Sequence, residues 1–310
     1  MREWPDTNLE KTNVASWVEI LSGGPPKDGI PALDAPTFHT VAQEGLLTPR
    51  EPVITVEIEG ETPRAYLIRH LTWHEILNDT IGDIPVAVTF CPLCNSGITF
   101  DRRVDMKVLS FGVSSKLRNL DMIMYDRGTQ SWWQPAIGTG IVGYHTDTEL
   151  ATLPSWMESW DKFVARNPDG LVMNMLDFGR NHGANTYVQY DSSFSPFLYF
   201  GEVPPHDIHA LAWVVRVGDS AWPLTRLAEE GTVTEDGVTL SWTAGQASAL
   251  DTARIADRRD VGNVRARDAA GTGPAPSALL PCGLPLVRAA LSLCLGRWRS
   301  CVCARPISSI

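Results

Sequence analysis

Hydrophobic and polar residues alternate with a period of two along much of the chain, which predicts short β-strands. An alternating run at residues 53–58, a turn at 59–61 and a second run at 65–68 predict a β-hairpin. A continuous apolar run at residues 86–90 predicts a buried strand that leads directly into Cys91. Further short runs follow at 98–102, 108–111, 122–125, 131–134 and 141–142. We therefore expect an α+β protein that is mostly β, built from antiparallel sheets or barrel-like β-units.

Helical periodicity is confined to two short segments. Residues 70–78 predict a helix that carries His70 and His74 on one face. Residues 154–167 predict a second helix, in which aromatic side chains recur with helical spacing. Residues 181–201 are rich in Asn, Ser, Tyr and Phe, and they predict a long functional loop or an irregular cover.

One order of elements occurs twice along the chain. A strand, a turn, an aromatic hairpin, a second turn and an apolar strand follow one another in residues 56–90 and again in residues 214–242. This recurrence predicts an internal duplication with a truncated second copy. The second copy has Thr243-Ala244-Gly245-Gln246 where the first has a cysteine pair, so the scaffold does not require cysteines there. The pair in the first copy is therefore expected to serve a function.

These patterns divide the chain into four segments. Residues 1–50 carry many turn formers and little periodicity, which predicts an extended N-terminal arm. Residues 51–210 form the first β-unit, and residues 211–264 form the incomplete second unit. Residues 265–310 are rich in Ala, Gly, Pro and Arg without strand alternation, which predicts a disordered tail. No function is expected of its cysteines, which are Cys282, Cys294, Cys301 and Cys303.

Composition and charge narrow the class of protein. Apolar residues make up 44% of the chain and charged residues 20%, which is typical of a globular protein. The net charge of −10 argues against a nucleic-acid partner, because phosphate binding needs clustered Lys and Arg. No apolar run approaches the roughly 20 residues of a transmembrane helix. The first residues lack the basic start and apolar core of a signal peptide, so the chain as written is expected to be cytoplasmic or to have lost its targeting segment.

The Cys-x-x-Cys pair, Cys91 and Cys94, is the predicted chemical centre. Two thiolates at this spacing suit a soft metal, copper or zinc. They also suit a thiol–disulfide oxidoreductase, with Cys91 as the attacking thiol. A third interpretation is an inert buried pair in a non-catalytic module that binds a small molecule or a protein partner. Redox pairs of this kind open a helix, whereas residues 95–100 predict a turn and a strand, so the metal hypothesis is favoured.

His74 is the predicted third metal ligand. His70 lies on the same helical face, although an exposed helix residue without a ligand role is its favoured interpretation. For His74, a hydrogen-bonded core histidine stays an alternative. The order His-Glu-x-x-His is absent, so a metalloprotease is not supported.

Cations, carboxylates and indoles gather around the predicted strand ends and form a candidate ligand-binding surface. Its residues are Lys116, Arg118, Asn119, Tyr125, Asp126, Arg127, Trp132, Trp133 and Arg180. Lys116 and Arg118 suit an anionic ligand. Structural ion pairs of these cations with Asp121 and Asp126 are the favoured alternative.

Several motifs make the chain resemble a family of bacterial and archaeal proteins, the domain of unknown function 3179. The central motif is Val88-Thr89-Phe90-Cys91-Pro92-Leu93-Cys94-Asn95-Ser96. Others lie at 22–31, 71–76, 111–114, 117–119, 124–127, 131–134, 153–155, 168–170 and 179–181, so the resemblance covers roughly residues 15–264. It implies no reaction. Members often resemble exported or lipid-anchored proteins, which implies an extracytoplasmic location.

Overall fold

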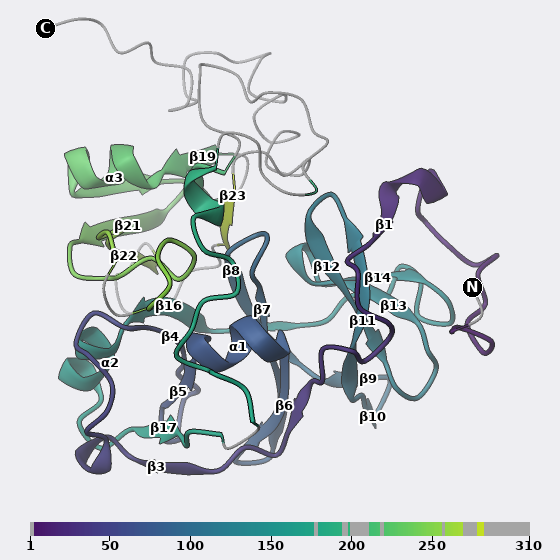
Figure 1. The fold of residues 1–310 in the computed structure, drawn as a ribbon, viewed down its shortest axis with the longest axis horizontal. Coiled ribbons are helices and arrows are strands. Elements are labelled where there is room, and N and C mark those ends of the chain that lie inside the picture. The colour runs from purple at the N-terminus through teal and green to yellow at the C-terminus, as the bar shows by residue number, and fades with distance from the viewer. Residues whose placement is uncertain are drawn as a thin grey trace, which may run out of the picture.

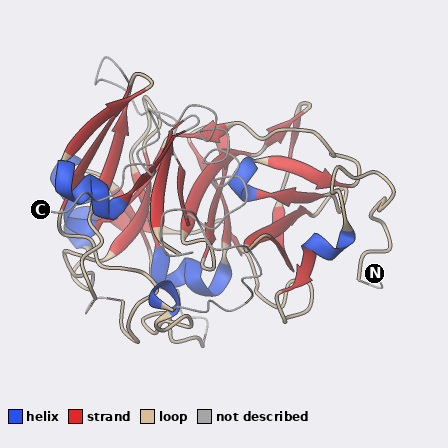
Figure 2. Cartoon of the chain, turned by 90° about the horizontal axis from the view of Figure 1, so that it is seen from above, coloured by secondary structure: helices blue, strands red, loops and turns tan. Residues whose placement is uncertain are grey.

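The computed structural model describes residues 3–176, 179–193, 198, 211–217, 220–255 and 258–268, together with the backbone of residues 278–281. The described residues form mostly strands, with three α-helices, as the sequence predicts. The three large sheets follow one another along the length of the molecule, and the N-terminal segment lies at one end (Figures 1 and 2).

Three five-stranded sheets form the body of the protein. The middle sheet has the order β15 (Thr152–Leu153), β8 (Ser96–Asp101), β7 (Ile84–Cys91), β6 (Ile76–Ile81) and β2 (Leu33–Asp34). A second sheet has the order β1 (Ile20–Ser22), β11 (Phe111–Arg118), β12 (Asp121–Asp126), β13 (Trp132–Gln134) and β14 (Thr139–Val142). The third has the order β16 (Ser155–Ser159), β4 (Pro52–Val56), β5 (Arg64–Leu67), β17 (Leu171–Met173) and β3 (Phe38–Thr40). The predicted hairpin of β4 and β5 is confirmed, as is the buried strand that runs into Cys91.

The remaining strands form smaller sheets. They are the pair β9 (Arg103–Val104) and β10 (Lys107–Val108), the sheet β19 (Ser220–Pro223), β18 (Trp213–Val217) and β23 (Ala278–Pro281), and the sheet β20 (Thr232–Glu235), β21 (Val238–Thr243) and β22 (Asn263–Arg267). None of the sheets among the described residues closes on itself, so the barrel-like alternative is wrong. Most neighbours are antiparallel, but β2 with β6 and β17 with β5 are parallel pairs.

The helices are short, and two predicted helices are shorter than expected. They are α1 (Ile68–His74), α2 (Trp160–Arg166) and α3 (Leu224–Glu230), with 3-10 turns η1 (Trp17–Glu19), η2 (Val41–Gln43), η3 (Pro135–Ile137) and η4 (Tyr190–Ser192). The helix predicted at 70–78 ends at His74, because Glu75 has a positive φ of 59° and Ile76 begins a strand paired with Thr89. The helix predicted at 154–167 begins only at Trp160, because the residues before it pair with β4. Cross-strand pairing overrides the local helical pattern in both places.

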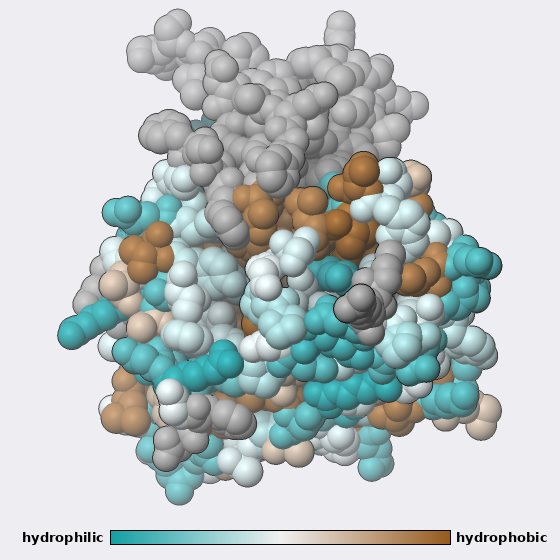
Figure 3. Space-filling view, turned by 45° about the vertical axis from the view of Figure 1, so that its right-hand side comes forward, coloured by the Kyte–Doolittle hydropathy of each residue, from teal (hydrophilic) through white to brown (hydrophobic). Residues whose placement is uncertain are grey.

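No helix among the described residues is both long and apolar enough to cross a membrane. The surface in Figure 3 is largely hydrophilic over its lower part, and hydrophobic residues gather in a band towards the top of that view.

The N-terminal arm ties the three large sheets together. Its strands β1, β2 and β3 each form an edge of a different five-stranded sheet. An arm with little periodicity of its own therefore obtains its extended conformation from the sheets that it completes.

The predicted boundary at residue 264 falls inside an element. Strand β22 crosses this boundary and pairs with β21, and the backbone of residues 278–281 pairs with β18. The rest of the predicted tail from residue 269 onward, including its four cysteines, lies outside the described residues.

The predicted repeat has a counterpart in the order of elements. Strands β4 and β5, helix α1 and strands β6 and β7 follow one another, as do β18, β19, α3, β20 and β21, and both helices have seven residues. A common origin of the two segments stays a prediction.

Asn78 joins the middle sheet to the second sheet. Its side-chain amide donates a hydrogen bond to the carbonyl of Phe111 (2.9 Å), and its side-chain oxygen accepts one from the Phe111 amide (2.9 Å). A second amide hydrogen reaches Asp34 Oδ1 at 2.9 Å. One buried side chain thus supplies both bonds that a neighbouring strand would give to Phe111.

Replacing Asn78 with Ala is expected to destabilise the protein by about 2–4 kcal/mol, because both backbone groups of Phe111 lose their partner in a buried position. Thr80→Ala is the matched control, since Thr80 is an exposed residue of the same strand. It is expected to change stability by less than about 1 kcal/mol. Urea unfolding followed by Trp fluorescence measures both variants, and equal losses would contradict this role of Asn78.

Candidate functional site

The predicted chemical centre lies where the tips of two β-hairpins meet. The turn between β7 and β8 spans residues 92–95, and the turn between β11 and β12 spans residues 119–120. The thiols of Cys91 and Cys94 both face the carbonyl oxygen of Leu120, with Sγ–O distances of 3.5 and 3.2 Å. Both cysteines are buried and free of disulfides. One backbone carbonyl of the second hairpin therefore receives both thiols of the first.

The cysteine turn is shaped by its own backbone. The Cys94 amide donates a hydrogen bond to Cys91 Sγ (3.3 Å), and the Asn95 amide donates one to the Pro92 carbonyl (3.2 Å). Asn95 has a φ of 47°, a left-handed conformation that Asn tolerates better than most residues. The hydrogen bond from Cys94 orients the Cys91 sulfur within the turn.

The facing turn is a strained two-residue connection. Asn119 and Leu120 both have positive φ angles, 54° and 68°, as a type I′ hairpin turn requires. Asn is common in such turns, but Leu is not, because its Cβ clashes in this conformation. The Leu120 side chain is buried in the core, which holds the residue in place. This turn directs the Leu120 carbonyl to the cysteines and brings Asp121 beside them.

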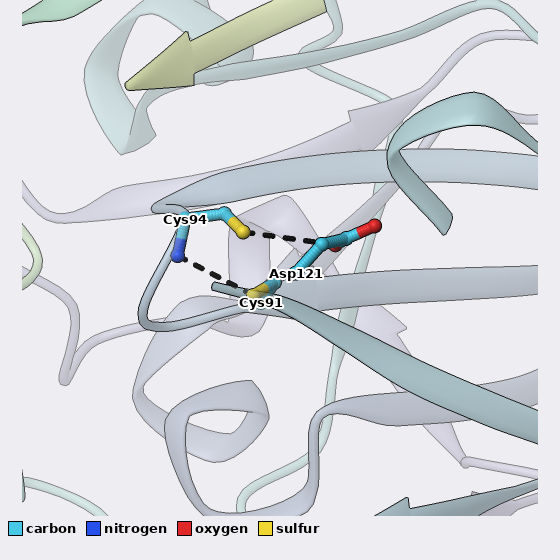
Figure 4. Close-up of side chains that lie close together, drawn as sticks. All are labelled: Cys91, Cys94 and Asp121. Atoms are coloured by element: carbon cyan, nitrogen blue, oxygen red, sulfur yellow. Dashed lines mark hydrogen bonds between the residues drawn. The ribbon is translucent and has the colours of Figure 1, made fainter. Parts of the chain in front are cut away.

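Asp121 completes the cluster. Its Oδ1 lies 3.6 Å from Cys94 Sγ, and its Oδ2 accepts a hydrogen bond from the Ala136 amide at 2.9 Å. The ligand atoms of Cys91, Cys94 and Asp121 all lie within 4.8 Å of one another (Figure 4). Burial raises the pKa of Asp121 to about 7, and burial also raises the pKa of Cys94 well above its usual value. The sequence did not indicate Asp121 as a ligand, because 27 residues separate it from Cys94.

His74, the predicted third ligand, is not part of this group. Its Nδ1 lies 2.7 Å from the carbonyl oxygen of Pro31, and its Nε2 lies 3.1 Å from Nε2 of His182. The interpretation of His70 as an exposed residue is wrong, since its side chain is fully buried. The helix packs its histidine face inward because β7 and residues 179–193 lie against it.

Buried ionisable groups lie between helix α1 and the cysteines. Glu75 is buried without a salt bridge among the described residues, and burial raises its pKa to about 8. Burial also raises the pKa of Tyr187, and the neighbouring charges of Glu75 and Cys91 add to this shift. The pKa of Tyr190 is raised by burial and then by Cys91 and Cys94. The sequence did not indicate that these three residues lie near the cysteines.

The predicted ligand-binding residues do not converge on one point. Arg118 binds Glu19 (2.9 Å) and the side chain of Gln134 (3.1 Å), so its partner is not the predicted Asp121. Lys116 lies over the ring of Trp132, with 5.6 Å from Nζ to the ring centroid. Asn119 forms the turn described above.

The other members of that set also have partners within the chain. Tyr125 donates to Asp28 (2.5 Å), and Arg127 binds Asp34 (2.9 Å). The carboxylate of Asp126 accepts a hydrogen bond from Trp133 Nε1 (3.2 Å). Arg180 instead lies at helix α1, where it donates to the carbonyl of Trp73 (3.1 Å). Ligand binding by this set stays a prediction.

The family described as Protein of unknown function (DUF3179) matches residues 27–277. The chain belongs to this family. The matched residues of this DUF3179 protein include both hairpin turns of the site, His74 and residues 179–193. No curated protein and no solved structure matches the chain. The predicted membership is therefore confirmed, and the family description assigns no reaction.

Asn95→Gly is expected to stabilise the protein by about 1 kcal/mol. Gly adopts the left-handed conformation freely, and the change removes two buried amide atoms that have no hydrogen-bond partner in the described part of the chain. Gln130→Gly is the matched control, because Gln130 also has a positive φ (59°) but its amide nitrogen donates to the Arg127 carbonyl. Chemical denaturation compares the two. A loss of stability in Asn95→Gly would mean that the Asn95 amide has a bound partner.

Glu75→Gln is expected to remove a pH dependence of stability. The folded-state pKa of about 8 lies above the ordinary 4.5, so the folded protein retains a proton that the unfolded chain releases. Stability of the wild type therefore falls as pH rises from about 4.5 to 8, by up to ~1.4 kcal/mol per pH unit relative to the variant. Unfolding free energies at pH 5, 6, 7 and 8 measure this difference. Glu59 is exposed, so the unfolding free energy of Glu59→Gln should follow the same pH dependence as that of the wild type. If Glu75→Gln also follows the wild-type pH dependence, the raised pKa of Glu75 is refuted.

Proposed function

We propose that this DUF3179 protein binds a zinc or copper ion through Cys91, Cys94 and Asp121. The observation that carries the proposal is the convergence of two thiols and a carboxylate, all buried, within 4.8 Å of one another. No described Lys or Arg side chain forms an ion pair with Asp121. Three acidic groups without such compensation are costly to ionise in the interior, and a bound cation removes that cost.

The donor set favours zinc over copper(I). Zinc accepts thiolate sulfur and carboxylate oxygen together, whereas copper(I) prefers soft donors alone. Two thiolates and one carboxylate leave a fourth tetrahedral position. The Leu120 carbonyl, which both thiols already face, or an external ligand would occupy that position.

A thiol–disulfide oxidoreductase is less well supported. Ser96 begins strand β8 directly after the cysteine turn, so the pair does not open a helix whose N-terminus would lower a thiol pKa. The raised pKa of Cys94 points the same way. Both cysteines are also nearly inaccessible, with 2% and 1% of their surface exposed, so a partner thiol would not reach them.

The test is the metal content of the full chain, purified without chelators and measured by inductively coupled plasma mass spectrometry. One background has Cys282, Cys294, Cys301 and Cys303 replaced by Ser, so that the only thiols left are Cys91 and Cys94. This background is expected to bind about one equivalent of zinc or copper at the thiol site. Adding Cys91→Ser and Cys94→Ser should remove that equivalent. Asp121→Asn should weaken affinity at least about tenfold, because a charged ligand becomes neutral.

The control for the carboxylate is Asp101→Asn, since Asp101 belongs to the hairpin that carries the cysteines but pairs with Arg103. It should leave metal content unchanged. If the background binds no metal that depends on Cys91 and Cys94, even after reconstitution with zinc or copper(I) under reducing conditions, the proposal is wrong. Redox titration of the pair would then test the oxidoreductase hypothesis.

A further inference from the structure

Three histidine side chains are buried together beside helix α1. His70 and His74 lie one turn apart on the helix, and His182 comes from the irregular segment 108 residues after His74. The ring of His182 lies 4.6 Å from that of His70 and 5.3 Å from that of His74, measured between centroids. All three side chains are buried. The sequence holds seven histidines, so this cluster gathers nearly half of them.

The hydrogen bonding of His74 leaves a lone pair directed at His182. A carbonyl oxygen only accepts, so Nδ1 of His74 must carry the proton that it shares with Pro31. Burial lowers the pKa of His74, which favours the neutral ring with a single N–H. Its Nε2 therefore presents a lone pair to Nε2 of His182 at 3.1 Å. Donation from the remote nitrogen to a backbone carbonyl is the usual arrangement of a metal-binding histidine.

His182 lies directly opposite this lone pair. Burial lowers its pKa, which favours the neutral ring. Without a metal, Nε2 of His182 donates a hydrogen bond to Nε2 of His74. A divalent ion between the two nitrogens would replace the shared proton. Two nitrogens on one tetrahedral zinc, each about 2.0–2.1 Å from the ion, stand roughly 3.3 Å apart, close to the separation found here.

His70 supplies the third imidazole. It is fully buried, yet neither of its ring nitrogens has a hydrogen-bond partner among the residues that the structure describes. Leaving buried polar atoms unpaired destabilises a folded protein. The three histidine nitrogens do not yet form a group within 4.8 Å, since among the described residues only the cysteine cluster does. A rotation of His70 towards His182 would complete the set without breaking a hydrogen bond.

We infer that His70, His74 and His182 form a second metal site, for a divalent ion that prefers imidazole nitrogen, such as zinc. It does not depend on the thiol site, because the two share no ligand. Three neutral ligands leave a fourth position open, as in catalytic zinc sites. Arg69 and Arg180 lie close enough to act electrostatically on these rings, so an anionic oxygen ligand suits that position.

The test uses zinc alone on a full chain in which all six cysteines are replaced by Ser. Equilibrium dialysis is expected to show about one equivalent bound, and His182→Phe should abolish it while keeping an aromatic ring against His70 and Trp73. His145→Phe is the matched control, because His145 is buried against Trp133 outside the cluster. It should retain the zinc. The inference fails if the cysteine-free chain binds no more zinc than its His182→Phe variant.

A second variant separates binding from folding. In metal-free protein, His70→Leu should melt at the same temperature or higher, because it removes two unpaired buried nitrogens. Added zinc should raise the melting temperature of the parent chain but not of His70→Leu. An equal zinc-induced rise in both would overturn the assignment of His70.

If the cysteine-free chain does not fold, cobalt(II) binding to the wild-type chain distinguishes the histidine site from the thiol site. A thiolate-to-cobalt charge-transfer band reports the cysteine site alone. His182→Phe should reduce bound cobalt by one equivalent and leave that band intact. If His182→Phe loses neither bound cobalt nor the band, or loses both together, a separate histidine site is contradicted. A missing band with cobalt still bound at the histidines would instead count against the thiol site only.

Discussion

The carbonyl of Leu120 is the contact on which the candidate site depends. It accepts both cysteine thiols, and it does so because two consecutive residues hold left-handed conformations at the hairpin tip. Strain of this kind persists only where the surroundings over-determine the backbone. Here the buried Leu120 side chain and the hydrogen bonds of Asp121 do so. The hydrogen bonds between Asn78 and Phe111 fix how the middle sheet and the second sheet meet, and therefore where the two hairpin turns lie.

The N-terminal arm influences both candidate centres. Its strands complete the edges of the three large sheets, so that it holds together elements far apart in the sequence. Between two of these strands, the carbonyl of Pro31 sets the protonation of His74. A segment with almost no periodicity of its own thus controls which nitrogen of a buried histidine is available as a ligand.

The two clusters differ in chemistry although their backbones are neighbours. The Phe90 amide donates to the Glu75 carbonyl at 2.8 Å, so the end of helix α1 lies against the strand that leads into Cys91. One cluster contains three acidic groups and suits a cation that neutralises them. The other contains three imidazoles, so an anionic ligand from outside the protein would balance the charge of a bound ion. Burial raises the pKa of Glu75, Tyr187 and Tyr190, and the two tyrosines are close enough to the cysteines to be influenced by them.

The sequence alone determined the features that depend on neighbouring residues. Alternation predicted the β-rich class and the strand before Cys91. The spacing of Cys91 and Cys94 predicted a shared site, because a turn brings the sulfurs of cysteines three positions apart close together. Helical spacing likewise placed His70 and His74 on one face. The ends of helix α1 and of the predicted second helix were wrong, because pairing with β7 and β4 competes with local propensity.

Only the tertiary structure decided which side chains meet across long separations. Asp121 and His182 lie 27 and 108 residues from Cys94 and His74, and no periodicity connects them. Their positions follow from sheet register, from the strained turn at Leu120 and from an irregular segment packed on α1. Such contacts depend on the free energy of the whole fold rather than on any local pattern. The sequence therefore predicted His74 as the partner of Cys91 and Cys94, whereas the fold brings Asp121 to them.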